Sequence, residues 1–256
     1  APRTAWGWAW AGVLAGVLPA VVAFAPAHWL AGGVARATQG QVLLLQPRGT
    51  VWTGSAQLVL TGGQASKDSA ALPGRVDWQL RPTWGGLRAR LQAGCCTAEP
   101  LQAQVHLRWV GPQIPLADGQ SQWPAALLAG LGTPWNTLQP QGQLALQTRA
   151  LAVQWAAGRM VLSGQAQLDA RAMSSRLSTL RPMGSYRLVL QGGEVPTLAL
   201  STLDGALQLS GSGQWVGNRL RFAGEASAAP EREAALSNLL NIIGRRNGAR
   251  SIITVG

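Results

Sequence analysis

The stretch that decides the fold is Leu101-Gln-Ala-Gln-Val-His-Leu-Arg-Trp109, in which apolar and polar side chains alternate without a break. Successive side chains of a β-strand point to opposite faces of its sheet, so this alternation predicts a strand that is buried on one side only. A wet second face is typical of antiparallel sheets. The buried face would carry Leu101, Ala103, Val105, Leu107 and Trp109, and the wet face Gln102, Gln104, His106 and Arg108.

The same alternation recurs along most of the chain. Val76, Trp78 and Leu80 alternate with polar residues, and loops rich in Gly, Ser and Pro, such as 62–71, separate such segments. Many short strands of this kind predict a mainly β fold, an elongated, twisted antiparallel sheet of repeated hairpins. Further strands are expected at 41–46, 50–52, 56–60, 87–92, 143–148, 152–155, 159–169, 186–191, 197–202, 205–210, 214–216, 219–226 and 251–255.

Two short helices interrupt or follow the strands. The run 124–129 predicts a short middle helix that Pro134 prevents from continuing. Residues 230–244 predict a C-terminal amphipathic helix, with Pro230 in its first turn and Gly244 at its end. Its apolar stripe would pack on the sheet, or alternatively offer a groove to a partner helix. The stripe consists of Leu236, Leu239, Leu240 and Ile243.

An internal repeat accompanies the hairpins. Trp155 and Trp215 are each followed, at offsets of four, nine and eleven residues, by Arg, Gly and Ala. Repeated hairpins of this kind stack into an extended sheet, although any sheet of hairpins can produce similar spacing. We expect pseudo-repeat halves at 37–123 and 138–228.

The N-terminal segment has a different composition, because no charged residue occurs between Arg3 and Arg36. A continuous helix from Trp10 to Trp29 would rise ~28 Å, close to a hydrocarbon core of ~30 Å. We expect residues 1–36 to form a cytoplasmic stub and a transmembrane anchor, and residues 37–256 to form a β domain outside the cytoplasm. A signal peptide cleaved after Ala25 is the alternative. The aromatic edges of the anchor would be Trp6, Trp8, Trp10 and Trp29.

The charge and cysteine content restrict the function further. The chain has 21 basic and 10 acidic residues and a net charge of +11, but its arginines are scattered singly, which does not favour nucleic-acid binding. An anionic membrane surface near the anchor is a weaker alternative partner for these arginines. Cys95 and Cys96 are adjacent and are the only cysteines, so they could form a vicinal disulfide but no metal site with spaced pairs.

The sequence offers no catalytic, cofactor-binding or metal-ligating residues that we would nominate. His28 and His106 lack a carboxylate at the spacing of a catalytic triad. The segment from Gly211 to Gly217 superficially resembles a dinucleotide-binding loop, but its third glycine is one place late and no helix is expected after it. We expect a hairpin turn there.

Six further motifs stand out: 49-GTVWTG-54, 72-LPGRVDWQLRP-82, 181-RPMGSYRL-188, 203-LDGALQLSGSGQW-215, 221-RFAGEA-226 and 239-LLNIIGRR-246. Together they resemble the type II secretion system protein N family. The resemblance implies a single-pass inner-membrane protein with a periplasmic β domain. Such a protein is an accessory component of the machine that exports folded proteins from the periplasm across the outer membrane. The family is itself similar to AsmA-type β-groove proteins associated with envelope lipids, and it provides no catalytic residues to transfer.

Two classes of function remain, with an enzyme a distant third. In the first, the protein is a structural subunit whose anchor meets the inner-membrane platform and whose sheet edges meet periplasmic partners, the secretin among the candidates. In the second, the sheet forms an apolar trough that holds a lipid acyl chain. Its wall would include Trp78, Trp109, Trp155 and Trp215, although tryptophans at such positions are more often ordinary core.

Overall fold

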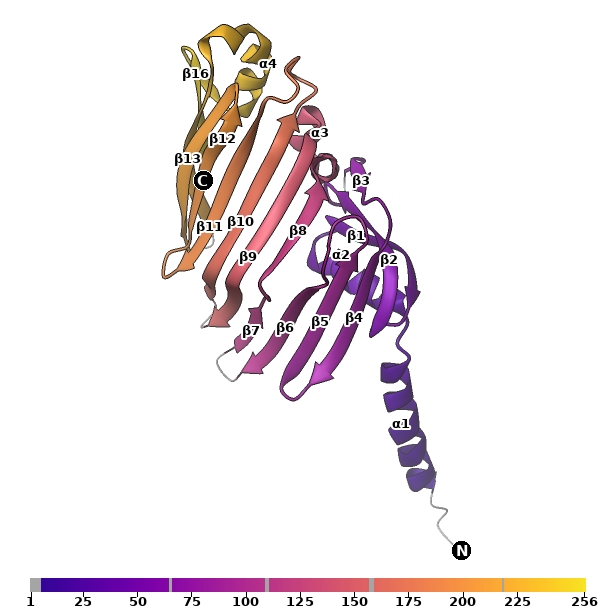
Figure 1. Cartoon of the computed structure of the whole chain (residues 1–256). Coiled ribbons are helices and arrows are strands. Elements are labelled where there is room, and N and C mark those ends of the chain that lie inside the picture. Colours follow the sequence, from indigo (N-terminus) through magenta and orange to yellow (C-terminus); the bar gives the residue numbers. More distant parts are fainter. Residues whose placement is uncertain (1–5, 65, 109–110, 157–158, 218) are drawn as a thin grey trace, which may run out of the picture.

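The structure is a computed structural model that describes residues 6–64, 66–108, 111–156, 159–217 and 219–256. Within these residues the chain is mainly β, with one large antiparallel sheet of sixteen strands and a few short helices (Figure 1). The sheet order is β1-β2-β4-β5-β6-β7-β9-β10-β11-β12-β13-β14-β16-β15, with β3 paired to β2 and β8 paired to β9. The predicted fold class is therefore confirmed for the sheet.

The strands follow one another along the sheet almost in sequence order, as expected for repeated hairpins. The first half contains β1 (Val42–Gly49), β2 (Thr53–Thr61), β3 (Ser69–Ala71), β4 (Val76–Thr83), β5 (Gly86–Ala93), β6 (Leu101–Arg108), β7 (Gly111–Pro115) and β8 (Gly119–Pro124). The second contains β9 (Gln141–Ala156), β10 (Arg159–Ser174), β11 (Gly184–Gly193), β12 (Thr197–Gly205), β13 (Leu207–Val216), β14 (Arg219–Ala228), β15 (Arg245–Asn247) and β16 (Arg250–Val255).

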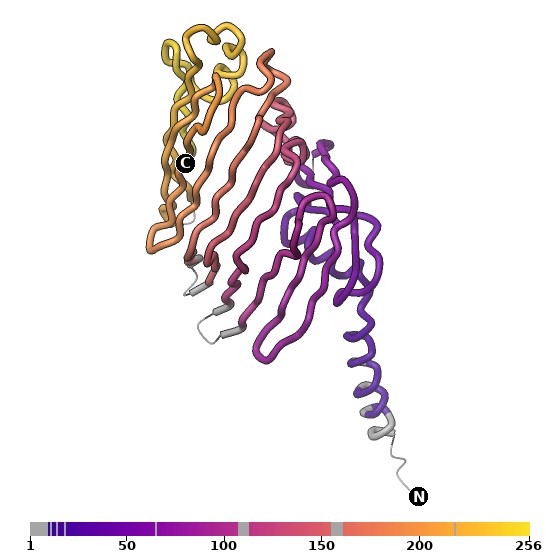
Figure 2. Tube along the Cα trace, viewed as in Figure 1, coloured from indigo at the N-terminus to yellow at the C-terminus, as the bar shows by residue number. Residues whose placement is uncertain are grey.

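The longest hairpin, β9–β10, shows how the sheet bends. Two strands were expected where β9 runs continuously through Ala150, which adopts a left-handed backbone (φ 47°) opposite Gly164 (φ 81°). The register of the β9–β10 pair shifts there, as at a β-bulge. Asp118 accepts a hydrogen bond of 2.5 Å from the Ala150 backbone N–H, so the bulge leaves this donor satisfied. The sheet as a whole curls into a trough (Figure 2).

Short helical elements cover parts of the sheet. The expected middle helix is a 3₁₀ helix, η1 (Ala125–Leu131), followed by the single turn of α3 (Trp135–Leu138). The C-terminal helix is present as η2 (Pro230–Arg232) and α4 (Glu233–Ile243). Leu236, Leu239 and Leu240 of its stripe are buried against the sheet, so the stripe contributes to the core.

The N-terminal segment differs from the prediction of a continuous helix from Trp10 to Trp29. It forms α1 (Trp6–Ala23) and α2 (Ala27–Ala37), with a break at Phe24–Pro26. Proline lacks a backbone N–H and disfavours helical geometry in the residue before it, which explains a break at Pro26. None of the helices in the described part of the chain is both long and apolar enough to cross a membrane. The predicted transmembrane anchor is thus unsupported by the structure.

Of the glycines in the segment that resembles a dinucleotide-binding loop, Gly217 lies in a turn after β13, with a left-handed backbone (φ 63°). Gly211 and Gly213 lie inside β13, and the strand continues to Val216. A Cβ on Gly211 would lie 2.4 Å from the ring of Phe222 on the neighbouring strand β14. Glycine is needed at Gly211 because the phenyl ring lies across β13 at this point, so the prediction of a turn was wrong for Gly211 and Gly213.

Candidate functional site

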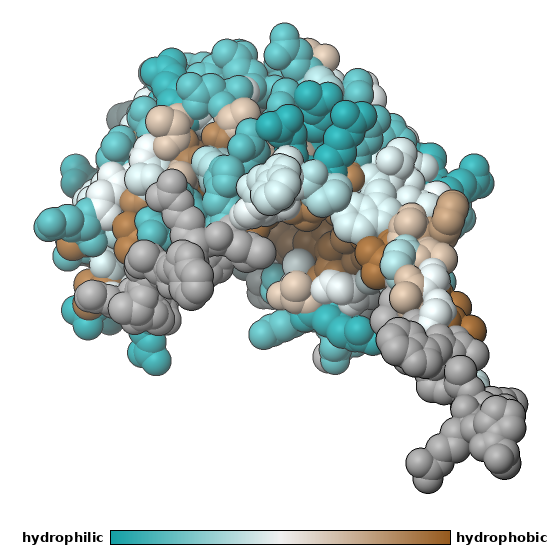
Figure 3. Space-filling view, turned by 90° about the horizontal axis from the view of Figure 1, so that it is seen from below, coloured by the Kyte–Doolittle hydropathy of each residue, from teal (hydrophilic) through white to brown (hydrophobic). Residues whose placement is uncertain are grey.

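The most prominent candidate site is on one face of the second half of the sheet, the face that α4 covers. We call it the inner face. Neighbouring strands place apolar side chains in register across it, as in the pairs Leu144–Ala170 and Leu168–Leu188. Seen from below, the hollow of the trough is lined with apolar residues (Figure 3). The inner face is therefore an apolar surface that the body only partly covers.

An apolar cavity of about 430 Å³ lies on the inner face beneath α4 and α3. Its wall is built by strands from β9 to β16, and it includes Leu200 and Leu209 of the sheet and Ile243 of α4. No charged side chain lines it. Ligand pockets typically measure about 300–1,000 Å³, so the cavity is large enough for a small molecule or a chain segment.

Tyr186 of β11 is the residue of this wall that carries a phenolic hydroxyl. The residue is only 6% exposed, and within the described structure its hydroxyl has no hydrogen-bond partner. Burial, together with the negative charge of Asp204, raises the pKa of Tyr186 well above its usual value. The hydroxyl therefore stays protonated in the folded protein.

The opposite, outer face of the same strands carries a polar cluster. Asp169 is 3% exposed and accepts two hydrogen bonds from Arg187, of 2.7 and 2.8 Å. Gln167 donates a third bond at 3.0 Å, and Arg171 lies 3.4 Å away. The hydrogen bond from Arg187 is the main reason that the pKa of Asp169 falls to about 2, against the opposing effect of burial. The cluster is a structural ion pair, because the carboxylate is already saturated with donors.

The tryptophans predicted to line a trough do not meet in one place. Trp78 is 3% exposed and belongs to a separate core with Ala27 and Ala56, where its indole N–H lies 3.1 Å from the carbonyl of Val51. Trp215 is half-buried on β13 and does not line the cavity. Trp109, and the side chain of Trp155, lie outside the described residues. Leucines, Met183 and Tyr186 form the wall instead.

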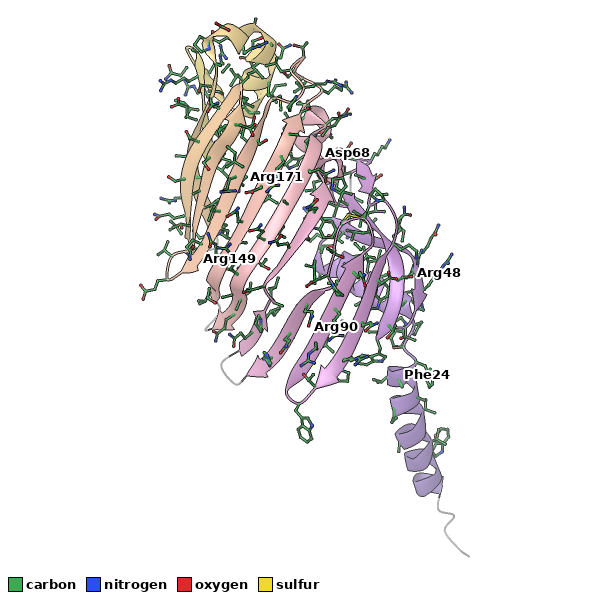
Figure 4. All side chains as sticks on the ribbon, in the orientation of Figure 1. Phe24, Arg48, Asp68, Arg90, Arg149 and Arg171 are labelled. Carbon is green, nitrogen blue, oxygen red and sulfur yellow. A yellow bond between two sulfur atoms is a disulfide. The ribbon has the colours of Figure 1, made fainter. Side chains whose placement is uncertain are left out.

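A second candidate site is the junction between α1 and the body, formed by Val22–Pro26 and the β1–β2 turn at Thr50–Thr53. Pro26 cannot donate to the carbonyl of Val22, and the indole N–H of Trp52 does so instead, at 2.6 Å. The Val51 backbone N–H donates to the carbonyl of Ala25 at 2.8 Å. These two bonds attach the end of α1 directly to the sheet. Phe24, at this junction, is 78% exposed (Figure 4).

The described part of α1 itself exposes apolar side chains, and it projects away from the sheet (Figure 1). Trp10, Val13, Val17, Val21 and Val22 are each between 45% and 59% exposed. Trp29, predicted at the far membrane edge, is 53% exposed on α2, which packs against β1. The side chains of Trp6 and Trp8 lie outside the described residues.

Cys95 and Cys96 form a disulfide in the loop between β5 and β6, with their Cα atoms 3.7 Å apart. Cys96 is 5% exposed and packs with Leu72 and Val76, and its carbonyl accepts a 2.7 Å bond from the Gln122 backbone N–H. The pair thus fixes a loop against β8. In the described residues no group of His, Cys, Asp and Glu side chains is arranged to hold a metal ion.

Comparison with known proteins gives one match. A family model described as type II secretion system (T2SS), protein N, matches residues 40–253. The chain belongs to the type II secretion system protein N family. No curated protein and no solved structure gives a significant match.

Membership in the protein N family makes the chain a component of type II secretion, and thus of a protein-transport machine. The match covers the β body, including the inner face, the cavity and the β1–β2 turn that holds α1. The strands predicted at 186–191 and 197–202 lie within β11 and β12. The sequence did not show that Tyr186 would be buried without a partner, because that depends on strand register and on α4.

Proposed function

We propose that this protein is a non-enzymatic component of the type II secretion machine at the inner membrane, with its β body in the periplasm. There it assists the assembly or function of the machine that exports folded proteins across the outer membrane. The observation that carries the proposal is the match of the whole β body to the protein N family. The exposed apolar side chains of α1 support a membrane location, since contiguous exposed apolar surface marks interaction with membranes or proteins.

The function is tested by deleting the gene in a host that exports a measurable enzyme by type II secretion. We expect the exported enzyme to accumulate in the periplasm, and expression of the full chain to restore its release. Unchanged export in the deletion strain would contradict the proposed role. Alkaline phosphatase fused after Gly256 tests the location: we expect an active fusion, whereas a fluorescent protein active only in the cytosol would contradict a periplasmic body.

Membrane association through α1 is tested separately. We expect the full chain to stay in the membrane fraction after carbonate extraction, and a Val17→Asp, Val21→Asp double variant to be released, since charge in an apolar membrane segment is costly. The matched control places the same change at Val195 and Val216, which are 51% and 46% exposed on the body. Release of the unmodified chain would exclude α1 as a membrane attachment.

We also propose that partner components of the machine pair with the open edge of β16. Strand β15 pairs only with Arg250–Ile252, so the backbone of the following residues 253–255 is bonded to β14 alone. Unpaired edge groups can accept an added strand from a partner. A photo-crosslinking residue at Thr254 should capture another secretion component, whereas the same residue at Ser212, inside the sheet on β13, should not. Equal capture from both positions would contradict docking at this edge.

A further inference from the structure

The turn between β4 and β5 exposes a large aromatic side chain at its tip. Trp84 is 105% exposed, so the whole of its indole is in contact with solvent and packs on no other part of the body. A single exposed apolar residue is common on protein surfaces and needs no explanation by itself. The charge of this hairpin and its position beside α1 give the exposed indole a specific use.

The two strands that lead to the turn place arginines together on one face. Arg81 of β4 is directly opposite Arg88 of β5, and Arg90 lies two residues further along β5 on the same face. Like charges directly opposite each other destabilise a sheet. None of these three exposed arginines forms an ion pair within the described residues, and the nearest acidic residue of either strand is Asp77, near the start of β4. The hairpin therefore carries a positive charge that an anionic partner would balance.

Hydrogen bonds connect this hairpin to the junction where α1 leaves the body. The Leu80 backbone N–H donates to the carbonyl of Trp52 at 2.6 Å, and the indole of Trp52 donates to the carbonyl of Val22 in α1. Four residues of extended chain separate Leu80 from Trp84, so the tip lies ~13 Å beyond this contact. Strand β4 runs toward the end of the body from which α1 projects (Figure 1). A membrane that holds α1 therefore also meets the turn.

We propose that the β4–β5 turn is a second membrane contact, in which Trp84 enters the headgroup layer of an anionic bilayer while Arg81 and Arg88 bind lipid phosphates. The inference rests on the proposed attachment of α1 to the membrane. An indole has an apolar body and one N–H donor, which suits the boundary between water and lipid. A guanidinium forms paired hydrogen bonds with phosphate, and basic residues near an anionic surface are attracted to it. With two contacts, the tilt of the sheet relative to the bilayer is fixed.

The depth of the contact follows from the backbone of the turn. Hydrocarbon offers no partner to the N–H and C=O groups of an irregular turn, whereas headgroups and water do. The headgroup layer is ~5–8 Å thick on each side of the hydrocarbon core. We therefore expect Trp84 to lie in this layer, above the hydrocarbon.

Fluorescence quenching in the full chain tests the contact and its depth. The probe is a nitrobenzoxadiazole label on Thr83→Cys, next to Trp84, in vesicles of equal parts phosphatidylcholine and phosphatidylglycerol. Cys95 and Cys96 are bonded to each other and do not take up the label. We expect stronger quenching by a nitroxide at the top of the lipid acyl chain than by one at its end. A matched label on Thr179→Cys, exposed between β10 and β11 at the opposite end of the body, should remain unquenched (Figure 1).

Three results would overturn the proposal. The first is an unquenched label at Thr83→Cys, which would favour a protein partner for the turn. The second is equal quenching of the labels at Thr83→Cys and Thr179→Cys, which would show that the whole body lies on the bilayer. The third is stronger quenching by the nitroxide at the chain end, which would place the turn in the hydrocarbon.

Variants in the labelled protein separate the indole from the charge. Trp84→Ala should shift the equilibrium between bound and free turn about ten-fold toward the free turn, the effect of exposing one large apolar side chain. Arg81→Gln, Arg88→Gln should shift it about ten-fold as well, and so should high salt. The matched control, Arg245→Gln, Arg246→Gln, removes the same charge from exposed residues of β15 and should leave quenching unchanged. Undiminished quenching after Trp84→Ala, or equal losses in both arginine variants, would overturn the assignment.

The tests of α1 and of the turn can fail separately. Carbonate extraction reports whether α1 holds the chain in the membrane, whereas quenching at Thr83→Cys reports where the turn lies. A chain that is retained after carbonate but shows no quenching would overturn the second contact and leave the proposed function intact. Quenching in a chain that carbonate releases would support binding by the turn and contradict attachment by α1.

Discussion

Strands β10 and β11 carry two neighbouring residue pairs that meet opposite conditions. Asp169 pairs in register with Arg187 on the outer face, and the next pair, Ala170 with Tyr186, lies on the inner face. The outer carboxylate is buried yet receives hydrogen bonds from three side chains. The inner hydroxyl is also buried, but it receives and donates none within the described structure.

The difference shows which buried polar groups stabilise the folded state and which destabilise it. A buried charge that is fully hydrogen-bonded contributes to folding, whereas a buried hydroxyl without a partner opposes it. On these two strands the outer carboxylate is satisfied by neighbouring side chains, whereas the inner hydroxyl of Tyr186 has no partner in the described structure. Removal of the one polar group and removal of the other should therefore change stability in opposite directions.

The largest effect is expected where α4 closes the inner face. Leu240 is fully buried between α4 and the sheet, and Leu240→Ala should lower the free energy of unfolding by about 2–5 kcal/mol because it leaves a cavity. Ile242→Ala is the control: Ile242 is 46% exposed on the same helix, and its loss should cost less than about 1 kcal/mol. Urea unfolding followed by circular dichroism measures both. Equal effects would mean that α4 does not close this face.

A smaller effect is expected from the outer cluster. Asp169→Asn should lower stability at neutral pH by about 1–2 kcal/mol, because Arg187 loses its charged acceptor. The folded pKa of Asp169 is lowered from 3.8 to about 2, so its contribution is present above pH 3.8 and is lost as the pH falls toward about 2.

Urea unfolding at several acidic pH values checks this prediction. The unmodified protein should lose stability across that pH range, and Asp169→Asn should lose less. Asp77→Asn, at an exposed aspartate of β4, is the matched control and should leave the acid dependence unchanged. An acid dependence that survives in Asp169→Asn would show that other carboxylates cause it.

The sheet could be predicted from the sequence because the pattern that indicates a strand lies within that strand. Alternation in segments such as Leu101–Arg108 reports which residues share a face, and the stripe from Leu236 to Leu240 reports the buried side of α4. Both patterns follow from the geometry of one strand or one helix. The lack of charged residues also distinguished the N-terminal segment from the β body. It did not predict that this segment is divided into two helices, α1 and α2. Pro26 is a signal for that break, because of its effect on Ala25.

The wall of the cavity could not be predicted because it is formed by residues that are far apart in the sequence. Tyr186 shares a buried core cluster with Leu236, Leu239 and Leu240 of α4, some fifty residues later in the chain. Trp78, predicted to line the trough, packs in a different core from the cavity. Gly211 looked like part of a turn because glycine is common there, and only the β13–β14 register shows that Phe222 requires it.

The smallest effect is expected at Tyr186 and has the opposite sign. In the absence of a ligand, Tyr186→Phe should raise the free energy of unfolding by about 1 kcal/mol, because it removes a buried hydroxyl that has no partner. Thr202 provides the matched comparison. It lies opposite Tyr186 on β12, and its hydroxyl donates to the Leu209 carbonyl at 2.9 Å and accepts from the Leu209 N–H at 2.6 Å. Thr202→Val should therefore lower stability by about 1–2 kcal/mol.

The two hydroxyl substitutions test whether the hydrogen-bond partner decides the sign of the effect. Tyr186 and Thr202 lie opposite each other and share a face of the sheet, but the hydroxyl of Tyr186 has no partner, whereas that of Thr202 makes two hydrogen bonds. Urea unfolding of delipidated protein should separate them by about 2–3 kcal/mol. If both variants lose stability equally, the Tyr186 hydroxyl must have a partner in the folded chain, and the contrast with Asp169 would not hold.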